Sequence, residues 1–238
     1  PFDFESVEFL EQINIPFYKI ASADITNTPL QEKIAETGKP VILSTGASKL
    51  EDVKRAHEVI TKKNENLYIL HCTASYPAKI EDMNLNCIKT LIKTFPNNII
   101  GLSDHENGID AASIAYMLGA RIFEKHFTLN RSWKGTDQSF SLEPAGLKKL
   151  IRNLNRIPKM LGSEKKEILE SEKAPIKKMA KSIVASSNLK EGIVIKINDI
   201  KFKSPGGGLA PYFRDQIVGK KLKLNKKKDD LISFEDLY

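Results

Sequence analysis

The sequence has few of the features that would assign it to several classes of protein. Only two of its 238 residues are cysteines, Cys72 and Cys87, so we expect no disulfide framework and a reducing, cytoplasmic setting. No apolar run approaches the roughly 18 residues of a membrane span, and no basic segment followed by an apolar one opens the chain. We therefore expect neither secretion nor a membrane partner.

Acidic residues are outnumbered, because 37 Lys and Arg stand against 30 Asp and Glu, a formal net charge of +7. Much of the excess lies beyond Lys148, in runs such as residues 226–228. The runs carry no interleaved aromatic residues and no recognisable binding module, so nucleic acid is not an expected partner. An anionic small substrate is a better reason for cationic side chains near a site.

Over residues 1–160, short apolar runs alternate with segments in which apolar residues have helical spacing. The first of these segments predicts a helix at 6–13. The apolar runs lie at 17–22, 40–46, 67–73, 99–102 and 121–123, and helices are predicted at 30–37, 49–62, 85–95, 109–118 and 144–160. This alternation indicates an α/β fold with a parallel sheet. The runs are almost continuously apolar, which is typical of strands buried on both faces, as in a barrel ringed by helices.

Five strand–helix units are too few to close a (β/α)8 TIM barrel. Either the sheet is open, or the front of a barrel is missing from this chain. Pro1 has no strand before it, and five strands alone would leave two parallel edges and an uncovered apolar interior. We therefore predict a truncated chain that holds about the last five units of the barrel.

Two histidines follow neighbouring strands of the predicted sheet. His105 comes after the run at 99–102, and His126 comes after the run at 121–123. Since the chemistry of such sheets lies beyond the carboxyl ends of the strands, the two imidazoles are expected to face one cavity and to suit a divalent metal. The alternative is two unrelated histidines, one in a loop and one in the core, because two ligands fall short of a closed site.

The pattern changes after Met160. Residues 162–173 are charged and indicate an exposed helical linker, and short strands are predicted at 182–185, 192–195, 200–203 and 219–222. A small β-rich domain of roughly 60 residues is too small to carry much chemistry alone. We expect it to cover a site, with Gly206, Gly207 and Gly208 as a mobile loop.

Five motifs carry a resemblance to a known family. They are Lys-Ile-Ala-Ser-Ala-Asp at 19–24, Leu-Ser-Thr-Gly at 43–46, His-Cys-Thr at 71–73 with Tyr-Pro at 76–77, Gly-Leu-Ser-Asp-His at 101–105 and Glu-Lys-His-Phe-Thr at 124–128. In order and spacing they resemble the sialic acid synthase family, and the tail is similar to its antifreeze-like (SAF) domain. The resemblance implies a partial TIM-barrel domain at 1–160, a linker at 161–180 and a β-clip-like SAF domain at 181–238.

The resemblance also implies an activity. The family condenses phosphoenolpyruvate with an N-acetylated amino sugar, such as N-acetylmannosamine, to give a nine-carbon sialic-type acid and phosphate. Its members are domain-swapped homodimers that need a divalent metal, usually Mn²⁺ or Mg²⁺. The metal polarises the aldehyde oxygen of the sugar so that the enol carbon can attack.

Site residues carry over from the family motif by motif. His105 and His126 match the metal ligands; Lys19, Ser22, Ser44 and Ser103 match the groups that hold phosphoenolpyruvate; and Tyr76 and Asp137 match sugar-binding positions. Lysine and hydroxyl groups at strand ends suit a phosphate and a carboxylate, although a single serine is more often a helix cap or turn residue. Glu124 shares a strand side with His126 and is expected to be an outer partner or a general acid/base.

Three positions depart from the family pattern. Asp24 stands where the family has a glutamate that activates water, and Ala74 replaces an asparagine. Ser204 takes the place of an arginine that reaches the sugar from the partner's SAF domain, so Lys203 or Arg214 would have to replace it. These departures leave the reaction class intact and open the choice of sugar to 2,4-diacetamido sugars of the legionaminic and pseudaminic branches.

The predicted reaction uses Asp24 or Glu124 as the catalytic carboxylate that activates water. Two other classes remain open: a non-catalytic relative that binds a sugar or phosphate, and another phosphate-handling barrel enzyme, such as an aldolase with Lys19 as its Schiff base. Of the other histidines, we expect His71 to be a core residue and His57 to lie on the surface. We expect this chain alone to be inactive, because groups on the first barrel strands are absent.

Overall fold

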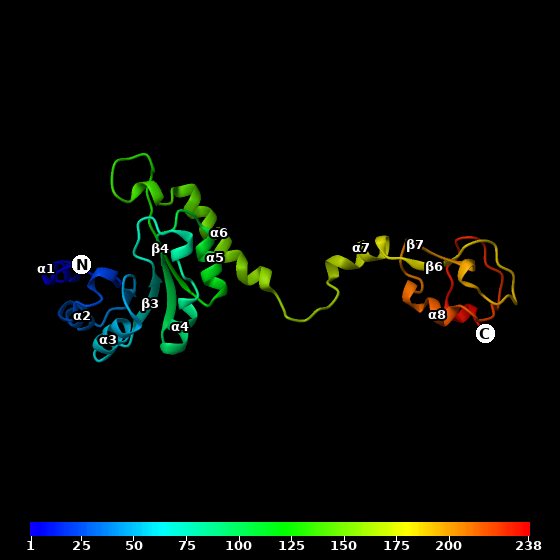
Figure 1. The fold of residues 1–238 in the computed structure, drawn as a ribbon, viewed down its shortest axis with the longest axis horizontal. Coiled ribbons are helices and arrows are strands. Elements are labelled where there is room, and N and C mark those ends of the chain that lie inside the picture. The colour runs from blue at the N-terminus through cyan, green and yellow to red at the C-terminus, as the bar shows by residue number, and fades with distance from the viewer. The chain divides into compact units, whose positions relative to one another are not determined.

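The computed structural model describes residues 1–238, and the chain forms two compact units, Pro1–Gly162 and Ser163–Tyr238. The first unit contains, in order, α1 (Phe4–Gln12), β1 (Tyr18–Ile20), α2 (Thr28–Ala35), β2 (Val41–Ser44), α3 (Leu50–Thr61), β3 (Leu67–Cys72), α4 (Cys87–Thr94), β4 (Ile99–Asp104), α5 (Asp110–Met117), β5 (Ile122–Lys125) and α6 (Pro144–Leu161). Strand and helix therefore alternate as predicted (Figure 1).

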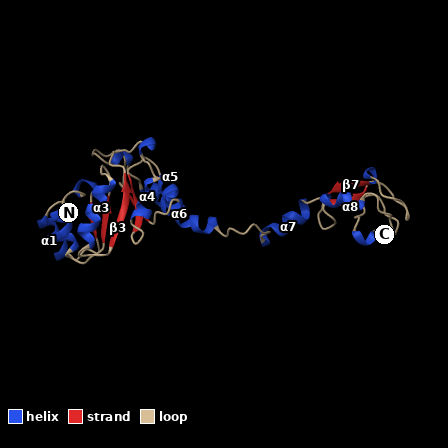
Figure 2. Cartoon of the chain, turned by 60° about the horizontal axis from the view of Figure 1, so that its bottom comes forward, coloured by secondary structure: helices blue, strands red, loops and turns tan.

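The five strands form one parallel sheet in the order β1-β2-β3-β4-β5. Neighbours in the chain are neighbours in the sheet, which is the arrangement of successive barrel strands, and the sheet is half of a barrel. Figure 2 shows the strands in red beside the helices that connect them. The prediction of a partial barrel is confirmed.

One face of the sheet packs on the helices. Tyr18, Val41, Leu43 and Ile69 lie on this face and are fully buried in the core that α1 to α5 cover. Alternate residues point to the other face, the inner face of the half-barrel. There Ile99 is 47 % exposed at the amino end of β4, while the carboxyl end carries polar side chains.

The strand ends differ from the prediction in one informative way. β4 continues through Ser103 and Asp104, because these residues pair in register with Glu124 and Lys125 of β5. The polar residues that were expected just beyond the strands are therefore part of the ladder. Their side chains alternate between the two faces of the sheet instead of lying in a loop.

The second unit is less regular than predicted. It contains α7 (Glu170–Met179), β6 (Ser182–Ala185), β7 (Ile200–Lys203) and α8 (Arg214–Ile217), with β6 and β7 antiparallel. The segments predicted as strands at 192–195 and 219–222 do lie side by side, joined by backbone hydrogen bonds such as Leu222 N to Ile193 O at 2.9 Å. They form one antiparallel bridge, between Val194 and Lys221, and not a full pair of strands. The unit has its own core, which includes Ile183 and Leu222. Neither unit contains a helix long and apolar enough to cross a bilayer.

Candidate active site

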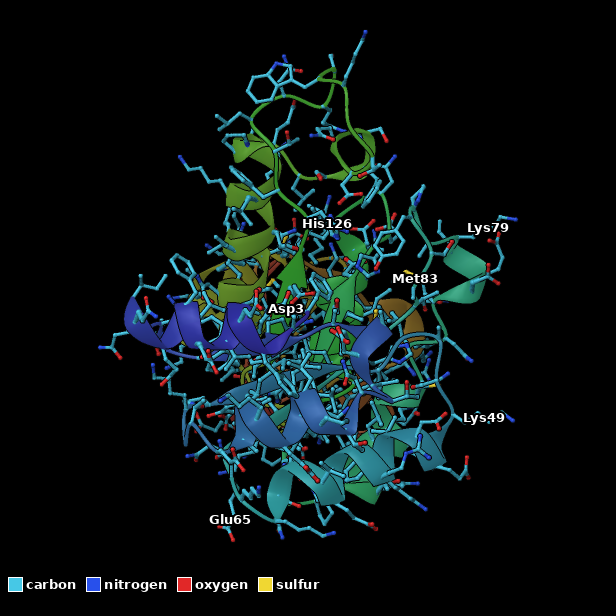
Figure 3. All side chains as sticks on the ribbon, turned by 90° about the vertical axis from the view of Figure 1, so that its left-hand side faces the viewer. Asp3, Lys49, Glu65, Lys79, Met83 and His126 are labelled. Carbon is cyan, nitrogen blue, oxygen red and sulfur yellow. The ribbon has the colours of Figure 1, made fainter.

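His105 and His126 lie together at the carboxyl ends of β4 and β5. Their ring centroids are 5.0 Å apart and the ring planes meet at 70°. In Figure 3 His126 lies beyond the tips of the strands, while Glu65, which precedes β3, lies at the opposite end of the unit. The sequence prediction that the two imidazoles share one place at the sheet's carboxyl edge agrees with this geometry.

The ring of His105 is fixed by main-chain contacts. Its Nδ1 lies 2.9 Å from the carbonyl oxygen of Thr73, and its own carbonyl accepts a hydrogen bond from Ala78 N at 3.0 Å. A hydrogen on Nδ1 leaves Nε2 of the neutral ring free as a ligand. Burial by itself would lower the pKa of His105, but contacts with the Cys72 thiol and the Thr73 carbonyl raise it overall.

His126 is half-buried, and its Nδ1 lies 3.5 Å from Asp137 Oδ2. Burial, followed by the neighbouring His105, lowers the pKa of His126, although Asp137 and Glu124 oppose this change. A lowered pKa favours the neutral imidazole, which is the form that binds a metal. Asp137 is thus an outer partner of His126 in this structure.

Glu124 contacts two of the residues that are predicted to hold phosphoenolpyruvate, Ser103 and Lys19. One of its carboxylate oxygens accepts a hydrogen bond from Ser103 Oγ at 2.7 Å, and the other lies 3.4 Å from Lys19 Nζ. Lys19 and Glu124 have 27 % and 39 % of their side chains exposed, so both can reach a ligand. The inner face therefore presents a cation, a carboxylate and a hydroxyl side by side.

Ser22, Ser44 and Cys72 lie at the ends of β1, β2 and β3. Ser22 Oγ accepts a hydrogen bond from Gly46 N at 2.9 Å and lies 3.5 Å from Cys72 Sγ. A Cβ on Gly46 would come within 2.9 Å of both Ser22 Oγ and Cys72 Sγ, so only glycine allows this close approach. Ser44 Oγ is buried without a hydrogen-bond partner, which leaves it available to a ligand.

Aromatic rings form a wall beside the histidines. The Tyr76 ring lies 4.2 Å from His105 and 5.8 Å from His126, and Phe140 lies 5.1 Å from His126. Burial raises the pKa of Tyr76, so its hydroxyl is a neutral donor and acceptor. Tyr76 is 54 % exposed, which suits a residue that contacts a ligand.

Asp24 has contacts of a different kind from those of Glu124. Its Oδ1 accepts a hydrogen bond from Asn27 Nδ2 at 2.9 Å, and its Oδ2 is buried without a partner. None of its hydrogen bonds reaches Lys19, Ser103 or either histidine. Of the two predicted carboxylates, Glu124 is the one that the structure brings into contact with the other predicted residues.

The remaining histidines have local roles. His71 is buried, its Nε2 lies 2.8 Å from the Met83 carbonyl, and burial lowers its pKa, as expected of a core histidine. His57 is more than a surface residue, because its Nε2 lies 3.0 Å from Asn98 Oδ1 and its ring contacts Phe95.

Sequence reasoning assigned no role to Cys72 in the site. Its Sγ lies 3.8 Å from His105 Nδ1. Burial raises the pKa of this thiol, but contacts with His105 and Ser22 outweigh that effect and lower it. Alternation along β3 places Cys72 on the same face as Leu70, and this was the signal available in the sequence.

The residues present fit a divalent cation bound at an open site. No group of three or more His, Cys, Asp or Glu side chains could enclose a metal. Two imidazoles on neighbouring strand ends supply two nitrogen ligands, and water and substrate would supply the rest. Ser44 Oγ, which has no partner, and the cation of Lys19 lie on the same face as the two histidines and suit an anionic substrate.

Family models match almost the whole chain. The model of the NeuB family matches residues 1–166, and the model of the SAF domain matches residues 180–237. A solved relative is described as the N-acetylneuraminic acid synthetase of Leptospira borgpetersenii in complex with citrate. It has 40 % sequence identity and a TM-score of 0.67, over 74 % of this chain and 61 % of that one.

Curated relatives have similar levels of identity. An uncharacterised protein of Methanocaldococcus jannaschii is 42 % identical over all of this chain and 70 % of its own length. Human N-acetylneuraminate-9-phosphate synthase is 38 % identical over 97 % of this chain and 64 % of its own length. The N,N'-diacetyllegionaminic acid synthase of Campylobacter jejuni is 37 % identical over 98 % of this chain and 70 % of its own length. The chain thus spans about two thirds of the length of these relatives.

Proposed function

The chain belongs to the NeuB family and carries a SAF domain, and we propose that it condenses phosphoenolpyruvate with an N-acetylated amino sugar. The products are a nine-carbon sialic-type acid and phosphate. The observation that carries the proposal is the pair His105 and His126, 5.0 Å apart at neighbouring strand ends, next to the contacts among Lys19, Glu124 and Ser103.

Lys19, Ser22, Ser44 and Ser103 bind phosphoenolpyruvate in this proposal. Lys19 supplies a point charge to the phosphate or carboxylate, and Ser44 donates a hydrogen bond. Ser22 and Ser103 donate theirs only when they release Cys72 Sγ and Glu124 Oε1. The unpartnered hydroxyl of Ser44 supports the assignment, because a buried donor without a partner carries a free-energy cost that a ligand removes.

A divalent cation, Mn²⁺ or Mg²⁺, would be held by His105 and His126 and would polarise the aldehyde oxygen of the sugar. Tyr76 and Asp137, which contact the two histidines, orient the sugar beside them. C3 of phosphoenolpyruvate then attacks the aldehyde carbon and forms the new C–C bond.

Glu124 is the carboxylate that we assign to the water molecule. It accepts the proton as water adds to C2 of the former enol, and phosphate then leaves with cleavage of the C–O bond. Ser103 and Lys19 hold both oxygens of this carboxylate, which supports a fixed orientation. Asp24 is the alternative base, favoured by its place at the position of the family's water-activating glutamate and by its unpartnered Oδ2.

The sugar remains the open part of the proposal, between N-acetylmannosamine and a 2,4-diacetamido sugar. Lys203 lies 2.6 Å from Asp229, and Arg214 lies 2.8 Å from Asp215. Both pairs are exposed, and exposed ion pairs are weak, so either cation can leave its acidic partner and replace the arginine missing at Ser204. In line with its family, we propose that the complete protein acts in the cytoplasm as a domain-swapped homodimer.

Phosphate release by the full-length protein tests the function. We expect release only when phosphoenolpyruvate, a hexosamine such as N-acetylmannosamine, and Mn²⁺ are all present. In water labelled with ¹⁸O, the label should enter the sugar acid and not the phosphate. The protein should be tested with a panel of hexosamines that includes 2,4-diacetamido sugars. If it released phosphate with none of them, the proposed synthase activity would be rejected in favour of a protein that only binds such ligands.

A further inference from the structure

Two cross-strand pairs, and a third pair of residues just beyond the ladder, lie at the carboxyl ends of β4 and β5. Ser103 pairs with Glu124 and Asp104 with Lys125 in the register of the ladder, and His105 and His126 follow directly. The first and third pairs lie on the inner face, where the site is. The middle pair, Asp104 and Lys125, points to the opposite face because side chains alternate along a strand.

The middle pair is a buried ion pair. Lys125 Nζ lies 2.8 Å from Asp104 Oδ2, and the two side chains are 5 % and 3 % exposed. Other ion pairs of this unit, such as Lys33 with Glu8, are far more exposed. Burial of two charges has a large desolvation cost, so a well-packed apolar pair would hold the strands together equally well, and stability alone is a weak reason for this one.

The same two side chains also bind the backbone that follows His105. Glu106 N donates a hydrogen bond to Asp104 Oδ1 at 2.8 Å, and Lys125 Nζ donates to the carbonyl of Glu106. His105 therefore lies between two residues that the pair fixes. Lys125 is in turn the residue before His126, so each histidine is bonded directly to a member of the pair.

We propose that the Asp104–Lys125 ion pair is a positioning device that sets the separation of His105 and His126 for one divalent cation. The inference rests on the proposed function only in taking the two histidines as metal ligands. The ion pair has a directional, fixed geometry, whereas an apolar contact at the same place would allow the two strand ends to shift. Loss of a partner that hydrogen-bonds a metal ligand directly typically costs about 10- to 100-fold in affinity, and we expect a pair that acts through the backbone to lie at the lower end of this range.

The test is the double variant Asp104→Asn with Lys125→Met in the full-length protein. Asparagine keeps the acceptor for Glu106 N, and the two charges are removed together, so neither member of the pair is left as an uncompensated buried charge. We expect a circular dichroism spectrum like that of the wild type and a dissociation constant for Mn²⁺ raised roughly 10-fold or more. The visible absorption spectrum of bound Co²⁺ reports the ligands of the metal. Measured well below the melting temperature, it should differ between the variant and the wild type.

The matched control is Glu11→Gln with Lys39→Met. It removes an ion pair of equal length, 2.8 Å, at the amino end of the sheet, and it should leave Mn²⁺ affinity and the Co²⁺ spectrum unchanged. Should the first double variant not fold, Asp104→Asn with Lys125→Gln replaces it with the same expectation, because it also removes both charges and glutamine can still donate to the Glu106 carbonyl.

Two results would overturn the inference. The first is a folded double variant of Asp104 and Lys125 whose Mn²⁺ affinity and Co²⁺ spectrum equal those of the wild type. This result would mean that the pair has only a structural role. A wild-type protein that binds Mn²⁺ but releases no phosphate would reject the proposed function and leave the positioning role standing. The second is a wild-type protein that binds no Mn²⁺, which would reject both the proposed function and the positioning role.

Discussion

Ser103 donates a hydrogen bond to Glu124 across β4 and β5, with 2.7 Å between Ser103 Oγ and Glu124 Oε1. Because the two residues are also partners in the strand register, the carboxylate is held by the sheet itself and not by a loop. A general base held in this way has a defined direction toward the inner face. This relationship distinguishes Glu124 from Asp24, whose contacts go to Asn27.

Replacement of Glu124 by glutamine should therefore remove catalysis and leave the fold intact. Glutamine retains the acceptor for Ser103 but cannot take a proton, so we expect kcat to fall roughly 100- to 10,000-fold with little change in melting temperature. Phosphate release under saturating substrates gives kcat. Asp24→Asn is the comparison, and a larger loss in that variant would move the role of base to Asp24.

Gly101 lies in β4 opposite Ile122 of β5, just below the site. A Cβ there would come within 2.5 Å of Leu70 Cδ2 and would also collide with the Ile122 carbonyl of the paired strand. We expect Gly101→Ala to cost about 3 kcal/mol in the free energy of unfolding, because the backbone of a buried strand cannot give way. Urea unfolding measures this cost.

Gly146→Ala is the matched control for Gly101. Its Cβ would meet only the Leu142 side chain, at 3.3 Å, and alanine favours the helix α6 by up to about 1 kcal/mol. Similar destabilisation by the two substitutions would contradict the packing that places β4 against β5.

Much of the half-barrel could be predicted from the sequence, because each apolar run ends at a polar residue and each helix repeats its apolar spacing. The pairing of His105 and His126 followed from the same rule, since parallel strands share one carboxyl edge. These predictions depend on periodicity along the chain, which a single sequence contains. For the same reason the five strands β1 to β5 appeared at the expected places.

Contacts between distant residues could not be predicted in this way. The ion pair of Lys19 with Glu124 joins β1 to β5, the two edge strands, and the contact of Cys72 with His105 joins the ends of the neighbouring strands β3 and β4. Both depend on how the side chains point across the curved sheet. In the second unit, the segment around Val194 was predicted as a strand from its β-branched residues. It makes only an isolated bridge there, since short segments in a small domain take their conformation from tertiary contacts.

The buried His71 predicts a specific pH dependence of stability. Burial lowers its pKa in the folded protein, whereas the unfolded chain has a value near 6.5. Between these two values the unfolded state binds more protons, so His71 lowers the free energy of unfolding as pH falls below about 6.5. We expect His71→Gln, which can still donate to the Met83 carbonyl, to reduce this loss. Urea unfolding at pH 7.5 and at pH 5.5 measures it, and an equal loss in both proteins would contradict the assignment.

The metal assignment gives the most direct prediction. In the full-length protein, His126→Ala should abolish turnover and weaken Mn²⁺ binding by more than about 100-fold, because an inner ligand is lost and not an outer partner. Electron paramagnetic resonance of free Mn²⁺ measures the binding without any need for activity. His57→Gln is the control, since His57 contacts Asn98 and Phe95 and lies outside the pair; it should bind Mn²⁺ as the wild type does. Removal of metal by EDTA should stop phosphate release, and added Mn²⁺ should restore it in the control but not in His126→Ala. If the alanine variant kept both binding and turnover, the two imidazoles would be neighbours without a shared ligand, and the chemistry assigned to this edge of the sheet would have to come from Lys19 and Glu124 alone.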